Sequence, residues 1–410
     1  IRHSPFAICL LCLLAFALRT HQLDGRPLWS DEGLSVYRAR QDVGTILRNE
    51  IIVQDVVTYD TQPPLYFLLL HGWRALVGES EFALKFPSVA WGVLLVPLLF
   101  AAGRRLLGSG TGWGAALLGA LSPLWVWYSQ ELRMYTMLTA LGLLAIYALG
   151  RGLQENRLVW VLTAGLVTAA ALYTHYGAVF LLVVEALLLL TVTLLRRRWL
   201  YLGGLLLAVG LTIPLVPVAL RRLGAGVEVH FNFVPLRIIL WDAWRAFTLG
   251  FSGEGPGVWP ALLLVLMLFA WGLVDLVRRR RWLGLVVLPA YLLVPVLGVY
   301  GLSLLKPAYQ GPRHIMLGSP ALYLGLGTGT AAIVRRWRAG GALPLLVVAL
   351  VMAQATGNSF DLERFGKDDY RSLARYVAAH ERPGDVLLIN DAVLTILMDY
   401  YYPGDLPVLA

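Results

Sequence analysis

Apolar runs about 20 residues long recur along almost the whole of this 410-residue chain, and short polar or arginine-rich turns separate them. A run of that length crosses the roughly 30 Å hydrocarbon layer of a bilayer as one helix. Only 14% of the residues are charged, whereas soluble domains carry about 25%. The sequence therefore predicts an all-α polytopic membrane protein.

We expect about 11 membrane helices. They are predicted at residues 4–20, 86–103, 112–128, 133–150, 158–174, 178–195, 200–220, 258–277, 283–304, 314–334 and 342–357. Leu65–Val77 is apolar but covers only about two thirds of the hydrocarbon layer, so it is expected to lie at the interface. Residues 235–250 are predicted to form a second interfacial helix, with tryptophans on one face.

The net charge of +9 does not indicate a nucleic-acid partner, because the basic residues gather at the ends of apolar runs. These clusters lie at residues 104–105, 196–198, 278–281 and 335–338. Such clusters mark the cytoplasmic side of membrane helices. With the interfacial assignment of Leu65–Val77, every cluster falls on that side, which predicts a multi-pass membrane protein with the acid pair at its outer face.

Residues 1–357 are predicted to form the membrane module, with outer loops at 21–84 and 221–256. From 358 to 410 the composition changes, and an amphipathic helix precedes an apolar stretch at 386–389 that is typical of a buried strand. We expect this segment to be the start of a small α/β domain outside the membrane that continues beyond residue 410.

Two adjacent acids, Asp31 and Glu32, follow the first apolar run directly. Either acid could simply cap the next helix or pair with an arginine. Alternatively, one carboxylate is a general base that takes the proton from an attacking hydroxyl group. Their place at the membrane surface favours an enzyme that acts on a lipid-borne substrate, with both acids as catalytic candidates.

A second motif is Gln62-Pro63-Pro64-Leu65-Tyr66. Consecutive prolines stop an incoming helix and fix the start of the next one, so the motif is compatible with a simple helix start. Its position between the acid pair and the interfacial helix makes Gln62 and Tyr66 candidates for a substrate pocket.

A third polar group lies at the outer end of the span 112–128. On a continuous helix Tyr128, Glu131 and Tyr135 would share one face. Charges at membrane depth cost about 2.5–3.5 kcal/mol each, so they normally face a cavity or have a partner. A structural network of Glu131 with Arg133, or one built on Gln130, is the alternative to a substrate pocket.

Several cations lie on the outer side, where the orientation rule predicts few of them. Basic residues at helix ends often extend to lipid headgroups, but Lys85, Arg133 and Arg313 are predicted to bind a phosphate. The other pocket candidates are His175, Tyr176, Lys306 and His314. The His and Cys spacings do not predict a metal site, and a need for a divalent metal is left open.

The order of these motifs resembles the GT-C superfamily of integral membrane glycosyltransferases. More narrowly, it is similar to the protein O-mannosyltransferase group and its bacterial relatives, which include the aminoarabinose transferase of lipid A. The segments that carry the resemblance are 29–32, 62–66, 83–88, 128–135, 173–176 and 311–314.

The resemblance implies transfer of a sugar, with inversion, from a polyprenyl-phosphate donor to a hydroxyl group of a protein, lipid or polysaccharide at the outer face. Asp31 would match the family's catalytic acid and Glu32 its neighbour. Lys85 falls where relatives carry a basic residue near the donor phosphate. Gln62 departs from the pattern, because lipid A enzymes tend to have lysine and several mannosyltransferases histidine before the first proline.

Two alternative functions would also require a cation-lined cavity at the outer end of the bundle. A transporter or flippase of lipid-linked glycans would bind the same lipid without chemistry, although such proteins often show inverted repeats that are not evident here. A ligase would transfer a whole glycan from a polyprenyl diphosphate.

Overall fold

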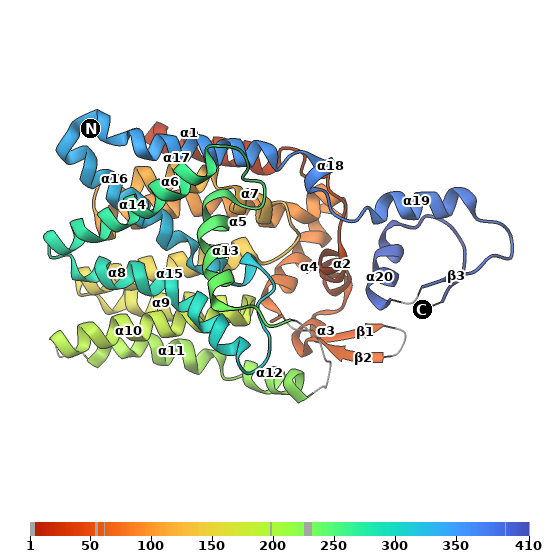
Figure 1. Cartoon of the computed structure of the whole chain (residues 1–410). Helices are drawn as coiled ribbons and strands as arrows, with labels where there is room; N and C mark the ends of the chain where they lie inside the picture. Colours follow the sequence, from red (N-terminus) through yellow and green to blue (C-terminus); the bar gives the residue numbers. More distant parts are fainter. Residues whose placement is uncertain are drawn as a thin grey trace.

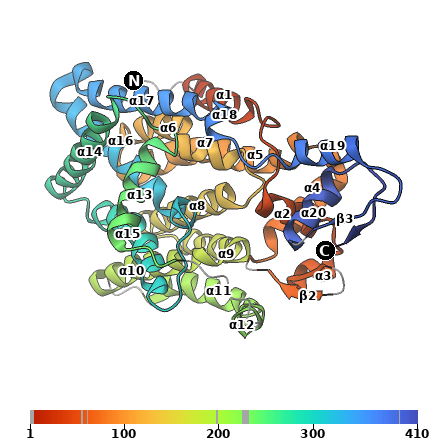
Figure 2. The same cartoon turned by 45° about the vertical axis from the view of Figure 1, so that its right-hand side comes forward.

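A computed structural model describes residues 5–53, 56–60, 62–196, 199–224, 232–389 and 391–409 of the chain. Long helices lie side by side in a bundle, and smaller helices and a hairpin cover one end of it (Figure 1). A C-terminal unit extends beyond that covered end, on the side of α2 and α4 (Figure 2).

The bundle is built from apolar helices that lie near the predicted spans, except that the predicted spans 112–128 and 200–220 are each divided into two helices. They are α1 (Pro5–Thr20), α5 (Glu81–Ala102), α6 (Thr111–Leu121), α7 (Pro123–Ser129), α8 (Tyr135–Glu155), α9 (Leu158–Thr174), α10 (Val179–Arg196), α11 (Leu202–Thr212), α12 (Leu215–Gly224), α14 (Val258–Arg278), α15 (Trp282–Ser303), α16 (Ser319–Trp337) and α17 (Leu343–Asn358).

Within the described residues, five helical segments are long and apolar enough to cross a membrane. A sixth is added if Trp199–Thr212 and Leu215–Arg221, which meet at 53°, form one broken span. The chain is thus an integral membrane protein. Other predicted spans fall on apolar helices of 10–17 residues, so the total of 11 stays a prediction.

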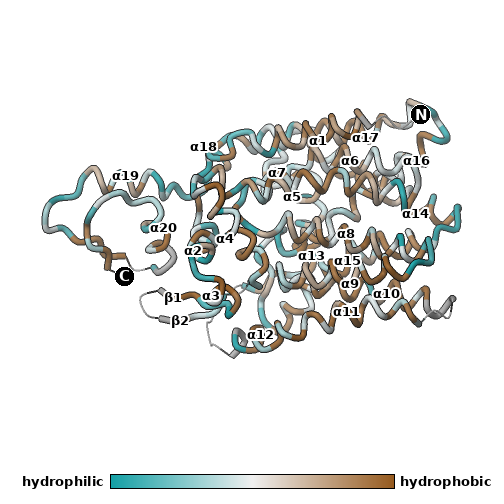
Figure 3. Tube along the Cα trace, turned by 180° about the vertical axis from the view of Figure 1, so that it is seen from behind, coloured by the Kyte–Doolittle hydropathy of each residue, from teal (hydrophilic) through white to brown (hydrophobic). Residues whose placement is uncertain are grey.

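The arginine clusters gather at the end of the bundle opposite α2 and α4. Ion pairs of 2.6 Å between Arg105 and Glu155 and of 2.7 Å between Arg335 and Asp275 join the helix ends there. Hydrophobic residues dominate the helices between the two ends (Figure 3). The side chains of the predicted cluster 196–198 lie outside the described residues.

The covered end consists of α2 (Ser30–Arg40), α3 (Val43–Arg48), the antiparallel hairpin of β1 (Glu50–Val53) and β2 (Val56–Tyr59), and α4 (Leu65–Val77). The helices α4 and α13 (Leu236–Leu249) match the two predicted interfacial segments.

Arg38 ties these small elements together. It is fully buried, and its guanidinium contacts Asp60 at 2.6 Å and the side-chain oxygen of Asn49 at 2.7 Å. It also lies 3.8 Å from the ring centre of Phe67 on α4. One cation from α2 therefore holds both the hairpin and α4, which gives the outer loop a defined shape.

The C-terminal unit contains α18 (Leu362–Phe365), α19 (Tyr370–His380), α20 (Ala392–Tyr401) and a parallel pair of β3 (Leu387–Leu388) with β4 (Val408–Leu409). The expectation of a buried strand at 386–389 was wrong in part. Ile389 is buried, whereas Val386 and Leu388 are 52% and 78% exposed. The sheet has only two described strands, and Ile389 packs with Ala374 of α19 and Met398 of α20.

Two helices of the bundle touch through glycines. A Cβ atom added at Gly165 on α9 would lie 2.1 Å from the carbonyl oxygen of Gly204 on α11. The nearest atom to a Cβ added at the neighbouring Gly203 would be 3.9 Å away. Close backbone contact of this kind requires a residue without a side chain.

We expect Gly165→Ala to destabilise the protein by about 1–3 kcal/mol, because the added methyl group forces α9 and α11 apart. Gly203→Ala is the matched control and should leave the melting temperature in detergent unchanged or slightly higher. Equal melting temperatures for the two variants would contradict this packing.

Candidate active site

The acid pair occupies the first turn of α2, where a helix N-terminus favours negative charge. Glu32 has the role that the capping alternative predicted, because its Oε2 accepts a hydrogen bond of 3.3 Å from the Trp29 amide. Its Oε1 accepts a second one of 2.6 Å from the Leu132 amide. Glu32 is fully buried, so it fixes α2 and cannot reach a substrate directly.

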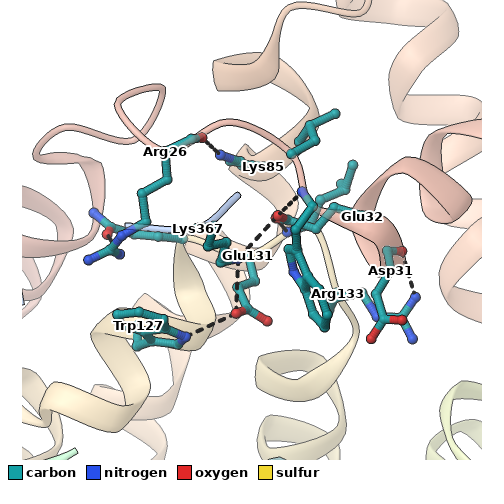
Figure 4. Close-up of polar contacts among 12 residues, drawn as sticks. Arg26, Asp31, Glu32, Lys85, Trp127, Glu131, Arg133 and Lys367 are labelled. Atoms are coloured by element: carbon teal, nitrogen blue, oxygen red, sulfur yellow. Dashed lines mark hydrogen bonds and ion pairs between the residues drawn. The ribbon is translucent and has the colours of Figure 1, made fainter. Parts of the chain in front are cut away.

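The second partner of Glu32 comes from the C-terminal unit. Lys367 places its Nζ 3.1 Å from Glu32 and 3.0 Å from Glu131 (Figure 4). Burial by itself would raise the pKa of Glu32, but the positive charges of Lys367 and Lys85 and the Leu132 amide outweigh it and lower that pKa. Glu32 is therefore ionised.

Asp31 has the opposite environment. Its side chain is 33% exposed, and its Oδ2 lies 3.1 Å from the guanidinium of Arg313. Arg313 is held in turn by the side chain of Gln310 at 2.8 Å. The pair presents one accessible carboxylate next to one fixed cation, which is an arrangement that can take up a proton beside a bound anion.

The segment between α7 and α8 shows where the prediction of one helix face for Tyr128, Glu131 and Tyr135 was wrong. The helix α7 ends at Ser129, α8 begins at Tyr135, and the residues between them form a turn. The Leu132 amide donates to Glu32 instead of to a carbonyl group of its own helix. A bond to a distant side chain thus replaces helix continuation.

The turn brings two of its charged residues to α2. Arg133 donates to the main-chain oxygen of Asp31 at 3.0 Å and to the Ser35 hydroxyl at 3.1 Å. Glu131 accepts from the Trp127 indole at 2.9 Å and pairs with Lys367, not with Arg133. Arg133 thus orients the backbone of the acid pair.

Gln130 belongs to a structural network, as the alternative proposed. Its amide nitrogen donates to the His21 carbonyl at 2.7 Å, and its oxygen accepts from Arg26 at 3.1 Å. Tyr66 is also buried, with its hydroxyl 3.3 Å from that of Ser88. Both residues stabilise the walls of the site.

Lys85 lies beside the acid pair but points away from the accessible space. It is fully buried and donates to the carbonyl oxygens of Arg26 at 2.6 Å and Leu23 at 3.4 Å, with Glu81 3.8 Å away (Figure 4). These three acceptors surround its ammonium group. Lys85 therefore holds the loop that leads into α2.

An apolar cavity of about 580 Å³ reaches His314, the residue that follows Arg313. Its apolar lining comes from α9, α10, α12 and α15 and includes Leu172, Phe180, Leu182, Leu215, Val216 and Val299. Its polar lining is Gln62, His175, Tyr176 and His314. A long hydrocarbon chain with a polar head would match this division.

Both histidines of this cavity are neutral. Burial and the neighbouring cations lower the pKa of His175 to about 3 and that of His314 to about 4. Among the described residues that line this cavity, three have a buried polar atom without a hydrogen-bond partner: His175 Nε2, Tyr176 OH and Gln62 Oε1. They are free to contact a ligand.

A second cavity of about 560 Å³ is lined by Arg313 itself. Its aromatic lining is Trp29, Trp127, Tyr128 and Phe251, and its charged lining includes Glu131, Arg313 and Lys367. Arg313 faces this cavity while its neighbour His314 faces the apolar one. Arg313, the partner of Asp31, thus lines the aromatic, polar space, and the residue next to it lines the hydrophobic one.

The last two predicted residues differ in placement. Tyr135 lies between the cavities, with ring centres 5.2 Å from Tyr128 and 6.0 Å from His175. Lys306 is exposed, and its side chain contacts no partner among the described residues.

Among the described residues, no group of three His, Cys, Asp or Glu side chains is close enough together to hold a metal ion.

Sequence reasoning missed Lys367 and the ring of Trp29. Lys367 lies more than 330 residues from Glu32 along the chain, in a polar segment without a recognisable motif. Trp29 belongs to the acid-pair motif, but its spacing does not reveal that Arg313 and Lys367 each lie 5.4 Å from its ring centre.

We expect Lys85→Met to destabilise the protein by about 2 kcal/mol, because hydrogen bonds from a charged donor to the loop carbonyls are lost. Differential scanning fluorimetry in detergent measures this change. Lys306→Met, which removes an exposed cation, should melt like the wild type. A Lys85→Met protein with unchanged melting temperature would contradict a loop-holding role.

Because the pKa of Glu32 is lowered on folding, its contribution to stability is present above its ordinary pKa of 4.5 and is lost as the pH falls through the lower folded value. We expect the melting temperature of the wild type to fall as the pH is decreased below 4.5. In Glu32→Gln that acid-dependent loss should be smaller, although the variant melts lower at pH 7.

Comparison with known proteins gives one family match. The model of the dolichyl-phosphate-mannose-protein mannosyltransferase family matches residues 61–217. No curated protein sequence matches the chain.

Solved structures show the same fold over nearly the whole chain. ArnT from Cupriavidus metallidurans has a TM-score of 0.70 at 15% identity, covering 98% of this chain and 85% of ArnT. The oligosaccharyltransferase AglB from Archaeoglobus fulgidus has a TM-score of 0.59 at 10% identity, covering 96% of this chain and 63% of AglB. The arabinosyltransferase EmbB from Mycobacterium smegmatis has a TM-score of 0.51 at 14% identity, covering 81% of this chain and 31% of EmbB. The family model covers 157 of the 410 residues, and these structures, all 15% identical or less, show that the chain shares their fold.

Proposed function

We propose that the protein is an inverting glycosyltransferase that moves a sugar from a polyprenyl-phosphate donor to a hydroxyl group of a protein, lipid or polysaccharide. The observation that carries this proposal is the position of the Asp31–Arg313 pair. The carboxylate of Asp31 lies 3.1 Å from Arg313, which lines the aromatic, polar cavity, and the next residue, His314, lines the apolar one.

The apolar cavity is the proposed site of the lipid chain. Its walls are supplied by membrane helices, so an isoprenoid could enter from the bilayer. Two structures with this fold support such a ligand, because ArnT has been solved with undecaprenyl phosphate and AglB with a dolichol-phosphate.

The phosphate is proposed to bind at the polar end of this cavity, next to Arg313. A guanidinium can donate two parallel hydrogen bonds to phosphate oxygens. The unpaired Nε2 of His175 and hydroxyl of Tyr176 are additional donors. Lys85 is left out of this site, because its ammonium is already surrounded by acceptors.

The proposed reaction is a single displacement. Asp31 takes the proton from the acceptor hydroxyl, and the acceptor oxygen forms a bond to the anomeric carbon of the sugar. The bond between that carbon and the phosphate oxygen breaks, and the electron pair leaves with the polyprenyl phosphate. The phosphate is a competent leaving group, so one carboxylate is sufficient.

The sugar and the acceptor are proposed to meet in the aromatic cavity. Aromatic rings such as Trp29 and Trp127 offer flat apolar faces to a pyranose or furanose. We further propose that the site faces the exterior of a bacterial inner membrane, since the arginine clusters lie at the opposite end of the bundle.

We expect Asp31→Asn to lower kcat for transfer at least about 100-fold, because the general base is lost. Its melting temperature should be unchanged, since Arg133 contacts the main-chain oxygen of Asp31. The assay uses purified protein with radiolabelled polyprenyl-phosphate sugars and measures release of the free lipid phosphate.

Asp399→Asn is the matched control. Asp399 is 68% exposed and pairs with Arg40 on the outer surface, so its loss should leave transfer unchanged. An active Asp31→Asn enzyme would refute the assignment of the base. Movement of the donor across vesicles without release of lipid phosphate would instead support the transporter alternative.

A further inference from the structure

Lys367 lies between two buried carboxylates that belong to different parts of the chain. Glu32 is fully buried, Glu131 is 4% exposed, and the side chain of Lys367 is 11% exposed. The Nζ–Oε distances of 3.1 and 3.0 Å place its ammonium in contact with both acids (Figure 4). A buried charge is stable only when it is paired, so each of these groups requires the others.

The segment that carries Lys367 is attached on both sides. Before it, Arg364 pairs with Glu254 at 2.7 Å. After it, Arg371 pairs with Glu81 at 2.7 Å and donates to the Asp24 carbonyl at 2.8 Å. The segment that carries Lys367 therefore has an ion pair on each side, and both ion pairs help to keep the Lys367 ammonium next to Glu32.

The contacts of Glu32 connect Lys367 to Asp31. Glu32 joins the first turn of α2 to the Leu132 amide, and Arg133, the next residue, donates to the Asp31 carbonyl. Other charges around Glu32 are Lys85 from α5 and Arg26 from the preceding loop. Loss of Lys367 would leave two neighbouring carboxylates in a buried space, and such a pair takes up a proton more readily.

We propose that Lys367 is a positioning residue for the transfer reaction: its ammonium keeps Glu32 and Glu131 paired and thereby holds the α2 N-terminus, with the Asp31 carboxylate, against the 130–134 turn. This inference rests on the proposed function and names a residue from outside the membrane bundle that the reaction requires. The C-terminal unit thus completes a site whose other groups come from the bundle and its outer loop.

The test compares Lys367→Met with Arg375→Met, which removes an exposed cation on α19 of the same unit. Lys367→Met should lower kcat by about tenfold to a hundredfold, because a small displacement of a catalytic group has effects of that size. The KM for the polyprenyl-phosphate donor should change less than kcat. Arg375→Met should retain wild-type transfer.

Two readouts separate positioning by charge from a general structural role. In Lys367→Met the acid limb of the pH–rate profile should move to higher pH, since the unpaired acids protonate earlier. The double variant Lys367→Met/Glu131→Gln has the same net charge in this cluster as the wild type. It should recover transfer by at least about threefold and return the acid limb toward the wild-type position.

The inference is overturned if Lys367→Met keeps wild-type kcat and pH profile, or if its loss of activity is not relieved by Glu131→Gln. Failure of the proposed function has a different signature, which is a wild-type protein that releases no lipid phosphate from any donor. In that case the pairing of Lys367 with Glu131 is tested by the melting temperatures of Lys367→Met, Glu131→Gln and the double variant. If the changes in melting temperature of the two single variants add up to that of the double variant, the pairing is overturned.

Discussion

Glu32 is the buried charge on which the geometry of the outer end depends. A carboxylate without solvent must be paired and hydrogen-bonded, because the cost of an isolated buried charge is far larger than the stability of a domain. Its partners come from three separated regions: the Trp29 amide, the Leu132 amide and Lys367. The hydrogen bonds and the ion pair of Glu32 therefore fix α2, the 130–134 turn and the C-terminal unit relative to one another.

The outer cations divide into two groups by what they contact. Arg38, Lys85 and Arg133 are buried and bind carbonyl oxygens, carboxylates or hydroxyl groups of the protein itself. Arg313 and Lys367 also have protein partners, but both line the aromatic cavity. Arg38, Lys85 and Arg133 therefore have a structural role and Lys367 is held by two carboxylates, whereas Arg313 lies next to the space proposed for an anionic ligand.

The sequence predicted helical segments well and their continuity less well. Leu65–Val77 was predicted with the bounds that α4 has, because the proline pair fixes its start and a glycine follows its end. The gap between the predicted spans 112–128 and 133–150 contains the turn between α7 and α8, but the break at Ser122 that separates α6 from α7 was not predicted. The sequence also did not predict that the Leu132 amide in this turn donates to Glu32, which lies 100 residues away. Local patterns contain no information about such a partner.

Composition and the order of motifs by themselves determined that this chain forms a membrane bundle and that its chemistry-bearing residues gather at one end. Hydrophobic run length and charge placement are local properties, so they can be read along the chain. Only the tertiary structure decided which acid is exposed and which cation accompanies it, selecting Asp31 with Arg313 and leaving Glu32 and Lys85 in the interior. Burial and pairing depend on residues that are distant in sequence, and adjacent acids with equal chemistry acquire different roles through them.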